Sequence, residues 1–153
     1  GLEMAAIGFA SVVIGFSELG GEGLAAWVTD RLGKERTVTL GLIANTIIIL
    51  SLPVLGQALT GALVWLFLFY LTFELTLVAL LPLMTELIPS FRATYMALAI
   101  AVFSLGRGAG ALLAPFLYRG GFLFNGAAAV VANTAAFILL RMIHVRPQPV
   151  PSE

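Results

Sequence analysis

Asp30-Arg31-Leu32-Gly33-Lys34-Glu35-Arg36 is a short block of charge between two long apolar runs. Its seven residues hold five charged side chains, in a chain of 153 residues with eight basic and eight acidic residues in all. The apolar runs on both sides reach the roughly 20 residues that a helix needs to cross ~30 Å of hydrocarbon. The pattern predicts that the chain crosses a membrane on each side of this block.

The composition of the whole chain is typical of a polytopic membrane protein. Hydrophobic residues make up 60% of the sequence and charged residues 10%, and the mean hydropathy is +1.05. Soluble domains carry roughly a quarter charged residues. The net charge is zero and no basic face runs along a segment, so we expect no nucleic-acid partner.

Catalytic and metal-binding residues are scarce. The chain has no cysteine and one histidine, His144, which excludes disulfides, thiol nucleophiles and multi-histidine metal sites. No nucleophile, base and orienting group occur together. We therefore expect no enzymatic activity, no cofactor and no metal.

Five apolar segments are long enough to span a bilayer. The predicted spans are about 4–29, 37–55, 62–87, 93–118 and 121–143. In lipid the backbone polar groups must be satisfied within the segment, so each span is expected to be an α-helix. Residues 144–153 form a tail in which alternate prolines prevent a helix. The sequence thus predicts an all-α integral membrane fold with one transmembrane domain, residues 1–153.

The basic residues gather at one end of the predicted spans. Cytoplasmic loops retain Lys and Arg. One side of the membrane receives Arg31, Lys34, Arg36, Arg92, Arg141 and Arg146. The other side receives only Arg119, with Arg107 set aside because it lies within a span. We therefore expect a cytoplasmic tail and an amino terminus outside, in the inner (plasma) membrane of a bacterium.

Four charged residues lie inside the spans. At ~1.5 Å per residue, Glu18, Glu74 and Arg107 each lie about 18 to 21 Å from the cytoplasmic end of their span, near the midplane. Glu22 follows Glu18 by one helical turn on the same face. A charge that faces lipid at this depth costs on the order of 3 kcal/mol or more. We expect these residues to share a polar interior in which Arg107 pairs with one acid and the others bind a cation or a proton.

Small and polar residues at helical spacing predict which helix faces meet. Such residues let helices approach closely in lipid. A stripe expected to face the protein interior comprises Gly8, Ser11, Gly15, Glu18 and Glu22. Two further sets are Gly106 with Gly110, and Asn125 with Ala129 and Asn133. For the buried charges we expect a role in translocation or coupling, with structural ion pairing as the alternative.

The segment A-W-V-T-D-R-L-G-K-E-R at 26–36 resembles the signature loop of the major facilitator superfamily, whose common form is G-x-L-A-D-R-x-G-R-R. The matching residues are Asp30, Arg31, Gly33 and Arg36, and Lys34 keeps the charge of an arginine, while Glu35 interrupts the basic pair so that Arg36 follows one position later. A second segment resembles the E-x-x-P-x-x-R sequence between the tenth and eleventh helices of that family. Its matching residues are Glu86, Pro89 and Arg92.

This resemblance implies that the five spans are helices eight to twelve, a partial second half of a twelve-helix fold. It implies secondary active transport of a small molecule by alternating access, as proton-coupled efflux or uptake. A midplane glutamate could also bind sodium in place of a proton. The expected partners are the lipid bilayer, the small-molecule substrate, protons and the missing N-terminal half, since the chain begins as if entered partway.

Two interpretations of the charged block stay open. In the first, Gly33 supplies the positive φ of a tight turn, Asp30 accepts hydrogen bonds from a helix N-terminus, and the loop latches the two halves together. In the second, the positive charges only anchor the cytoplasmic side. The alternative to a transporter is a five-span membrane scaffold or accessory subunit without transport activity of its own.

Overall fold

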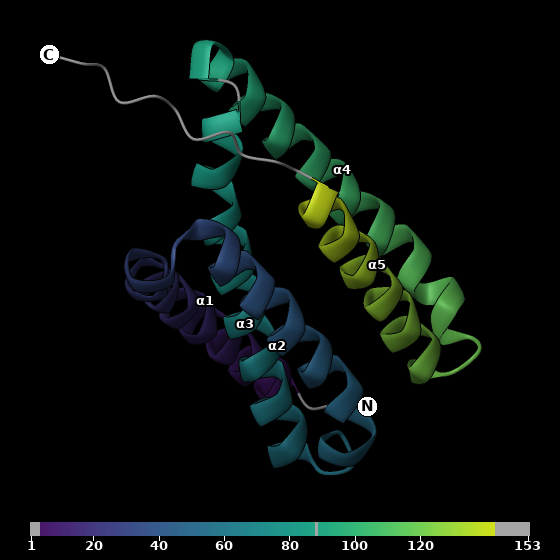
Figure 1. The fold of residues 1–153 in the computed structure, drawn as a ribbon. Coiled ribbons are helices and arrows are strands. Elements are labelled where there is room, and N and C mark those ends of the chain that lie inside the picture. Colours follow the sequence, from purple (N-terminus) through teal and green to yellow (C-terminus); the bar gives the residue numbers. More distant parts are fainter. Residues whose placement is uncertain (1–3, 88, 143–153) are drawn as a thin grey trace, which may run out of the picture.

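The computed structural model describes residues 4–87 and 89–142 (Figure 1), and within them every regular element is a helix. The elements are α1 (Met4–Leu32), α2 (Lys34–Leu55), α3 (Leu59–Leu87), the short 3₁₀ helix η1 (Pro89–Phe91), α4 (Arg92–Tyr118) and α5 (Phe122–Met142). All five α-helices are long and apolar enough to cross a membrane, which confirms the predicted all-α fold. The tail 144–153 lies outside the described residues.

The charged block is a break of one residue between two helices, not a loop. Only Gly33 lies outside α1 and α2, with φ at +83°, which confirms the positive angle expected there. The Gly33 N–H donates to the carbonyl of Thr29 at 2.9 Å, and the hydroxyl of Thr37 donates to the Gly33 carbonyl at 2.9 Å. The charged side chains around Gly33 are therefore held on helix ends.

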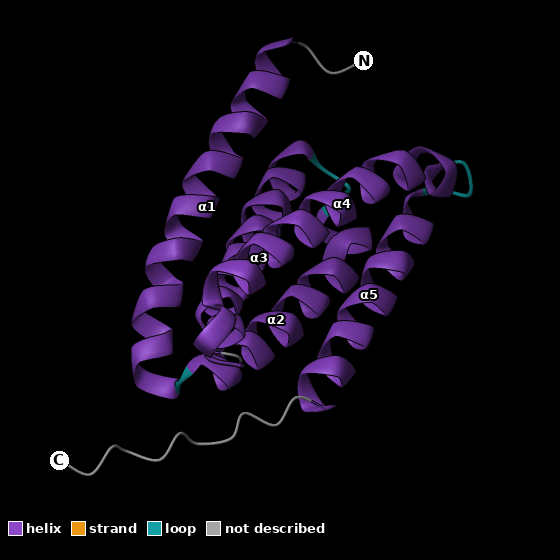
Figure 2. Ribbon diagram, turned by 90° about the horizontal axis from the view of Figure 1, so that it is seen from above, coloured by secondary structure: helices purple, strands orange, loops and turns teal. Residues whose placement is uncertain are grey.

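Helix α3 lies between α1 and α2, and glycines allow both contacts (Figures 1 and 2). A Cβ atom on Gly21 of α1 would lie 2.7 Å from the Cβ of Glu74 and 2.8 Å from the carbonyl oxygen of Leu71. On the other side, a Cβ atom on Gly41 of α2 would strike the Thr76 hydroxyl and lie 3.1 Å from the Thr76 Cβ. Only glycine fits at these two crossings, so the helix backbones are close enough to fix α3.

The remaining helices are attached more loosely. α5 packs on α2, while α4 contacts α5 and α3 and forms with α5 a pair beside the first three helices (Figure 1). A small apolar core joins α2, α3 and α5 through Val38, Leu42, Ala79, Leu83 and Leu140. No residue of α4 is buried. One long face of α4 is therefore open.

The predicted interior stripe of α1 is wrong for this chain. Gly8 and Gly15 have no atom within 4 Å of the place where a Cβ would stand, and Glu22 is exposed. The buried positions are instead Ser17 and Ala25, at 0% and 1% exposure, together with Gly21 between them. The difference has a physical reason, because the closest approach to α3 requires the missing side chain at Gly21.

Of the other two predicted sets of small-residue contacts, one is not formed and the other is formed in part. Gly106 and Gly110 have no atom near their Cβ positions, so the expected close approach at these glycines is wrong within the described chain. On α5, Asn133 does face a neighbouring helix and bonds to it. Asn125 is half-buried, and its buried Oδ1 has no hydrogen-bond partner within the described part of the chain.

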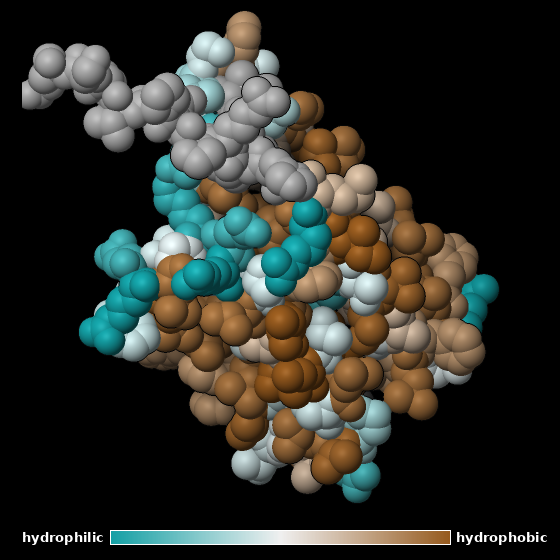
Figure 3. All heavy atoms as spheres, viewed as in Figure 1, coloured by the Kyte–Doolittle hydropathy of each residue, from teal (hydrophilic) through white to brown (hydrophobic). Residues whose placement is uncertain are grey.

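The surface is apolar over most of the face that Figure 3 shows, with hydrophilic residues gathered around the α1–α2 junction. The same end of the molecule carries the basic side chains of the helix termini. These are Arg31, Lys34, Arg36, Arg92 and Arg141, whereas Arg119 lies at the junction of α4 and α5. Arg146 lies outside the described residues.

Candidate functional site

Glu74 is the centre of the charged residues inside the spans. It lies on the side of α3 that meets α1, because its Cβ is the atom that a Cβ on Gly21 would strike. Glu18 and Glu22 flank Gly21 on α1, and both repel the Glu74 carboxylate, whereas Arg107 of α4 attracts it. The structure thus brings together the four intramembrane charges that the sequence singles out.

Arg107 reaches this group through aromatic contacts. Its guanidinium lies 5.8 Å from the ring centroid of Phe103, and that ring stacks on Phe73 of α3 at 6.2 Å. Phe73 directly precedes Glu74 in the chain. These contacts hold α4 against α3 at the depth of the acidic residues.

The expected ion pair between Arg107 and an acid is wrong. Among the described residues, the one salt bridge joins Lys34 and Glu86. Arg107 is exposed, and its guanidinium lies over the Phe103 ring, so it acts on Glu74 at longer range. Glu74 therefore lies near two other carboxylates and one guanidinium, without a closed ion pair to Arg107 among the described residues.

A metal site is not assembled from these acids. Within residues 4–87 and 89–142, no three acidic or histidine side chains converge closely enough to hold an ion. Glu18 and Glu74 are half-buried, while Glu22 is exposed. Because charges at this depth are unfavourable against lipid, the open side of α1 and α4 requires a polar or proteinaceous cover.

An apolar cavity of about 560 Å³ lies between α3 and α4, next to the charged group. Its lining includes Leu77, three residues after Glu74, and Phe103, four residues before Arg107. Both charged residues therefore stand one helical turn from the same end of the cavity. The volume lies in the range of small-molecule sites, and the lining is apolar, as such sites are.

An aromatic row along α3 was not anticipated from the sequence. Trp65 stacks on Phe69 at 5.2 Å between ring centroids, and Phe69 stacks on Phe73 at 6.4 Å. The indole N–H of Trp65 donates to the carbonyl of Ile48 on α2 at 2.6 Å, which fixes the start of the row. The signal in the sequence was the four-residue spacing of Trp65, Phe69 and Phe73, which places them on one helix face.

The two segments at the basic end are joined. The Nζ of Lys34 forms an ion pair with the Glu86 carboxylate, linking the start of α2 to the end of α3. Pro89 opens η1 directly after this point, and the exposed Arg92 begins α4. This ion pair therefore joins the segment 26–36 to the segment 86–92, the two segments on which the family resemblance rests.

The rest of the charged block faces outward. The guanidinium of Arg31 lies 4.1 Å from the ring centroid of Trp27, one turn earlier on α1. Asp30 and Arg36 are exposed. Within the described residues the Asp30 carboxylate accepts no hydrogen bond, so the expected contact with a neighbouring helix N-terminus is not formed in this chain.

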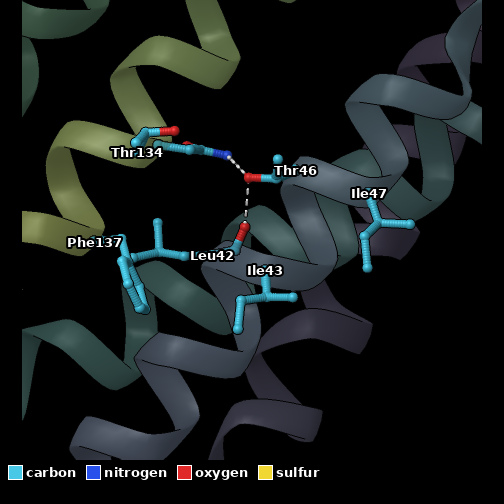
Figure 4. Close-up of a pocket in the computed structure, with 7 residues that line it drawn as sticks. Leu42, Ile43, Thr46, Ile47, Thr134 and Phe137 are labelled. Atoms are coloured by element: carbon cyan, nitrogen blue, oxygen red, sulfur yellow. Dashed lines mark hydrogen bonds between the residues drawn. The ribbon is translucent and has the colours of Figure 1, made fainter.

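A network of amides and hydroxyls joins α3, α2 and α5 within the spans. The Asn45 amide donates to the Thr72 hydroxyl at 2.9 Å and to the Phe69 carbonyl at 3.1 Å. The Asn133 amide donates to Asn45 Oδ1 at 3.0 Å and to the Thr46 hydroxyl at 3.2 Å. Figure 4 shows Thr46 at the end of this network, beside a pocket of about 220 Å³ between α2 and α5. The sequence signal for this network was the presence of Asn45 and Asn133 inside predicted spans.

Comparison with known proteins identified no relative of this chain. No family model matches the chain, and no characterised protein or solved structure is similar enough to count as a match. The five apolar helices indicate an integral membrane protein. The particular function must be argued from the site.

Proposed function

We propose that the chain is helices eight to twelve of a twelve-helix secondary transporter resembling the major facilitator superfamily, and that it carries a small molecule by alternating access. The observation that carries this proposal is the group around Glu74, in which three carboxylates and one guanidinium from α1, α3 and α4 interact inside the spans. Intramembrane ionisable residues that face one another mark ion or substrate pathways.

In this account Glu74, Glu18 and Glu22 exchange a proton, or a sodium ion, for substrate. Transporters place substrate and coupling-ion sites near the midplane, between repeats that rock against each other. The substrate would lie against the apolar wall between α3 and α4, with its polar part at Glu74 and Arg107. The missing N-terminal half would cover the exposed face of α4 and supply the other side of the site.

The charged block would act at the cytoplasmic side. Lys34 and Glu86 form an exposed ion pair there, between the start of α2 and the end of α3, and the rocking motion would not depend on it. Asp30 and Arg36 are exposed at the same end and free for contact with the other half. The proposed topology has the amino terminus outside and the C-terminus in the cytoplasm, in a bacterial inner membrane.

The experiment is proton-driven transport by the intact protein in membrane vesicles, screened with a panel of small molecules. Glu18→Gln and Glu74→Gln should lower the pH-driven transport that the wild type shows, while membrane insertion stays normal. Glu86→Gln is the control, because Glu86 is a carboxylate of α3 at the membrane surface, away from the Glu74 group. Unchanged transport and pH dependence in both midspan variants would overturn the assignment.

A five-span scaffold or accessory subunit is the other candidate, and the Asn45–Asn133 network favours it by holding three helices without charge. The nucleotide sequence upstream of the codon for Gly1 separates the two. The transporter requires about seven further apolar spans in frame, as its twelve-helix architecture implies. A start codon close to Gly1 would favour the accessory subunit.

A further inference from the structure

A groove at the basic end of the molecule lies between the start of α2 and the end of α5, apart from the Glu74 group. Its volume is about 410 Å³. Its lining comes from the last turn of α1, the first two turns of α2 and the last turn of α5, namely Leu32, Glu35, Arg36, Thr39, Leu40 and Arg141. Of these residues, the proposed transport mechanism uses only Arg36, at the cytoplasmic surface, and it gives the groove itself no role.

Two arginines from different helices line the groove. Neither Arg36 nor Arg141 has an acidic partner within ion-pair distance among the described residues. The guanidinium of Arg141 lies 5.1 Å from the Phe137 ring centroid, a contact that uses none of its N–H donors. Both guanidinium groups therefore present donors to whatever enters the groove.

In a membrane, the groove would lie at the depth of the lipid headgroups. It lies where the membrane-spanning helices end and where hydrophilic residues gather (Figure 3). Leu32 and Leu40 on its wall are 42% and 47% exposed, which gives an apolar surface next to the charges. The N-terminus of α2 adds the positive end of a helix dipole.

The charges of the groove select the ligand. Two arginines and Glu35 give a local net charge of +1, which complements one negative charge. Paired guanidinium groups match the oxygens of a phosphate. The Glu35 carboxylate and the Thr39 hydroxyl can accept hydrogen bonds from a headgroup hydroxyl.

We propose that this groove binds the headgroup of an anionic phospholipid of the phosphatidylglycerol type. The phosphate lies between Arg36 and Arg141, the glycerol hydroxyls lie at Glu35, and the acyl chains run along Leu32 and Leu40. Basic pockets between membrane helices recognise anionic headgroups in this way. The lipid would fasten α5 to the α1–α2 junction.

Native mass spectrometry of the full 153-residue chain, released from detergent with added phosphatidylglycerol, measures this binding. Each of Arg36→Gln and Arg141→Gln should weaken binding roughly fivefold, and the double variant roughly 25-fold, at the usual contribution of one basic residue near a membrane surface. Arg92→Gln is the matched control, since Arg92 lies at the same end outside the groove and should leave the affinity unchanged. Circular dichroism verifies equal helix content in all variants.

Three results would overturn the proposal. The first is an equal loss in Arg92→Gln and in the double variant, which would show a general surface potential in place of a site. The second is equal binding of phosphatidylethanolamine, which would show that the net charge is not recognised. The third is displacement of the lipid by millimolar inorganic phosphate, which would identify a soluble anion as the ligand.

Discussion

Replacing Gly21 with alanine tests the α1–α3 crossing on which the charged group depends. The added Cβ would lie 2.7 Å from the Cβ of Glu74 and 2.8 Å from the Leu71 carbonyl oxygen. Both atoms belong to, or lie next to, the α3 backbone, so neither can rotate away and α1 must move. Overpacking of this kind costs about 1 to 3 kcal/mol.

Gly23→Ala is the matched control, because it lies two residues along the same helix and has no atom within 4 Å of its Cβ position. Both substitutions gain the same preference of alanine for helix, about 1 kcal/mol. Gly21→Ala should therefore be about 1 to 3 kcal/mol less stable than Gly23→Ala. Unfolding in mixed micelles with increasing dodecyl sulfate, followed by far-ultraviolet circular dichroism, measures this difference.

The separation of α1 and α3 supplies a second readout. Because the chain contains no cysteine, cysteines at Gly20 and Leu71 can report on it by oxidative cross-linking. A Cβ on Gly20 would lie 3.1 Å from the Leu71 side chain, so the pair should cross-link in the native background and more slowly beside Gly21→Ala. Equal stability of the two alanine variants, within about 0.5 kcal/mol, would refute the crossing.

Further substitutions at three sites test other contacts by the same unfolding assay. Gly33→Ala should destabilise the chain by about 1 to 3 kcal/mol through backbone strain alone, because φ is +83° and no atom lies near the new methyl group; a neutral result would contradict the observed turn. Asn133→Ala should cost about 1 to 2 kcal/mol through two lost interhelical hydrogen bonds. A double variant with Asn45→Ala should lose less stability than the sum of the two single losses, because the two residues share a hydrogen bond. An additive loss would contradict the network. Lys34→Gln and Glu86→Gln should each cost less than about 1 kcal/mol, since their side chains are 32% and 45% exposed, and the loss should shrink at high salt; a salt-independent loss would point to another cause.

The all-helical content was predictable because the information is local. Runs such as 37–55 are apolar for long enough to span a membrane, and the polar groups of the backbone then require a helix. Gly33 was predictable as the turn for the same reason, since glycine alone adopts its φ freely. The charged residues beside it were interpreted as a loop because they interrupt two apolar runs, although Lys, Glu and Arg are good helix formers.

The rotation of each helix about its axis was not predictable. In α1 apolar residues occur on every side, so no periodic pattern tells the face toward protein from the face toward lipid. The predicted stripe contained Gly8 and Gly15, whereas the face that packs on α3 contains Gly21, to which α3 brings a backbone carbonyl. The Glu74 group was found from depth along the spans, whereas the stacking of Phe103 on Phe73 depends on where α4 packs against α3.

Transport by the intact protein is the most direct test of the role proposed for Glu74. Wild type, Glu74→Gln and the surface control Glu86→Gln are compared in vesicles, with a pH gradient imposed and proton flux followed by dye quenching as substrate is added. The glutamine keeps the size of the side chain and removes its charge. We expect substrate-dependent proton flux to persist in wild type and Glu86→Gln and to be lost in Glu74→Gln. Equal flux with the same pH dependence in Glu74→Gln and wild type would contradict the account.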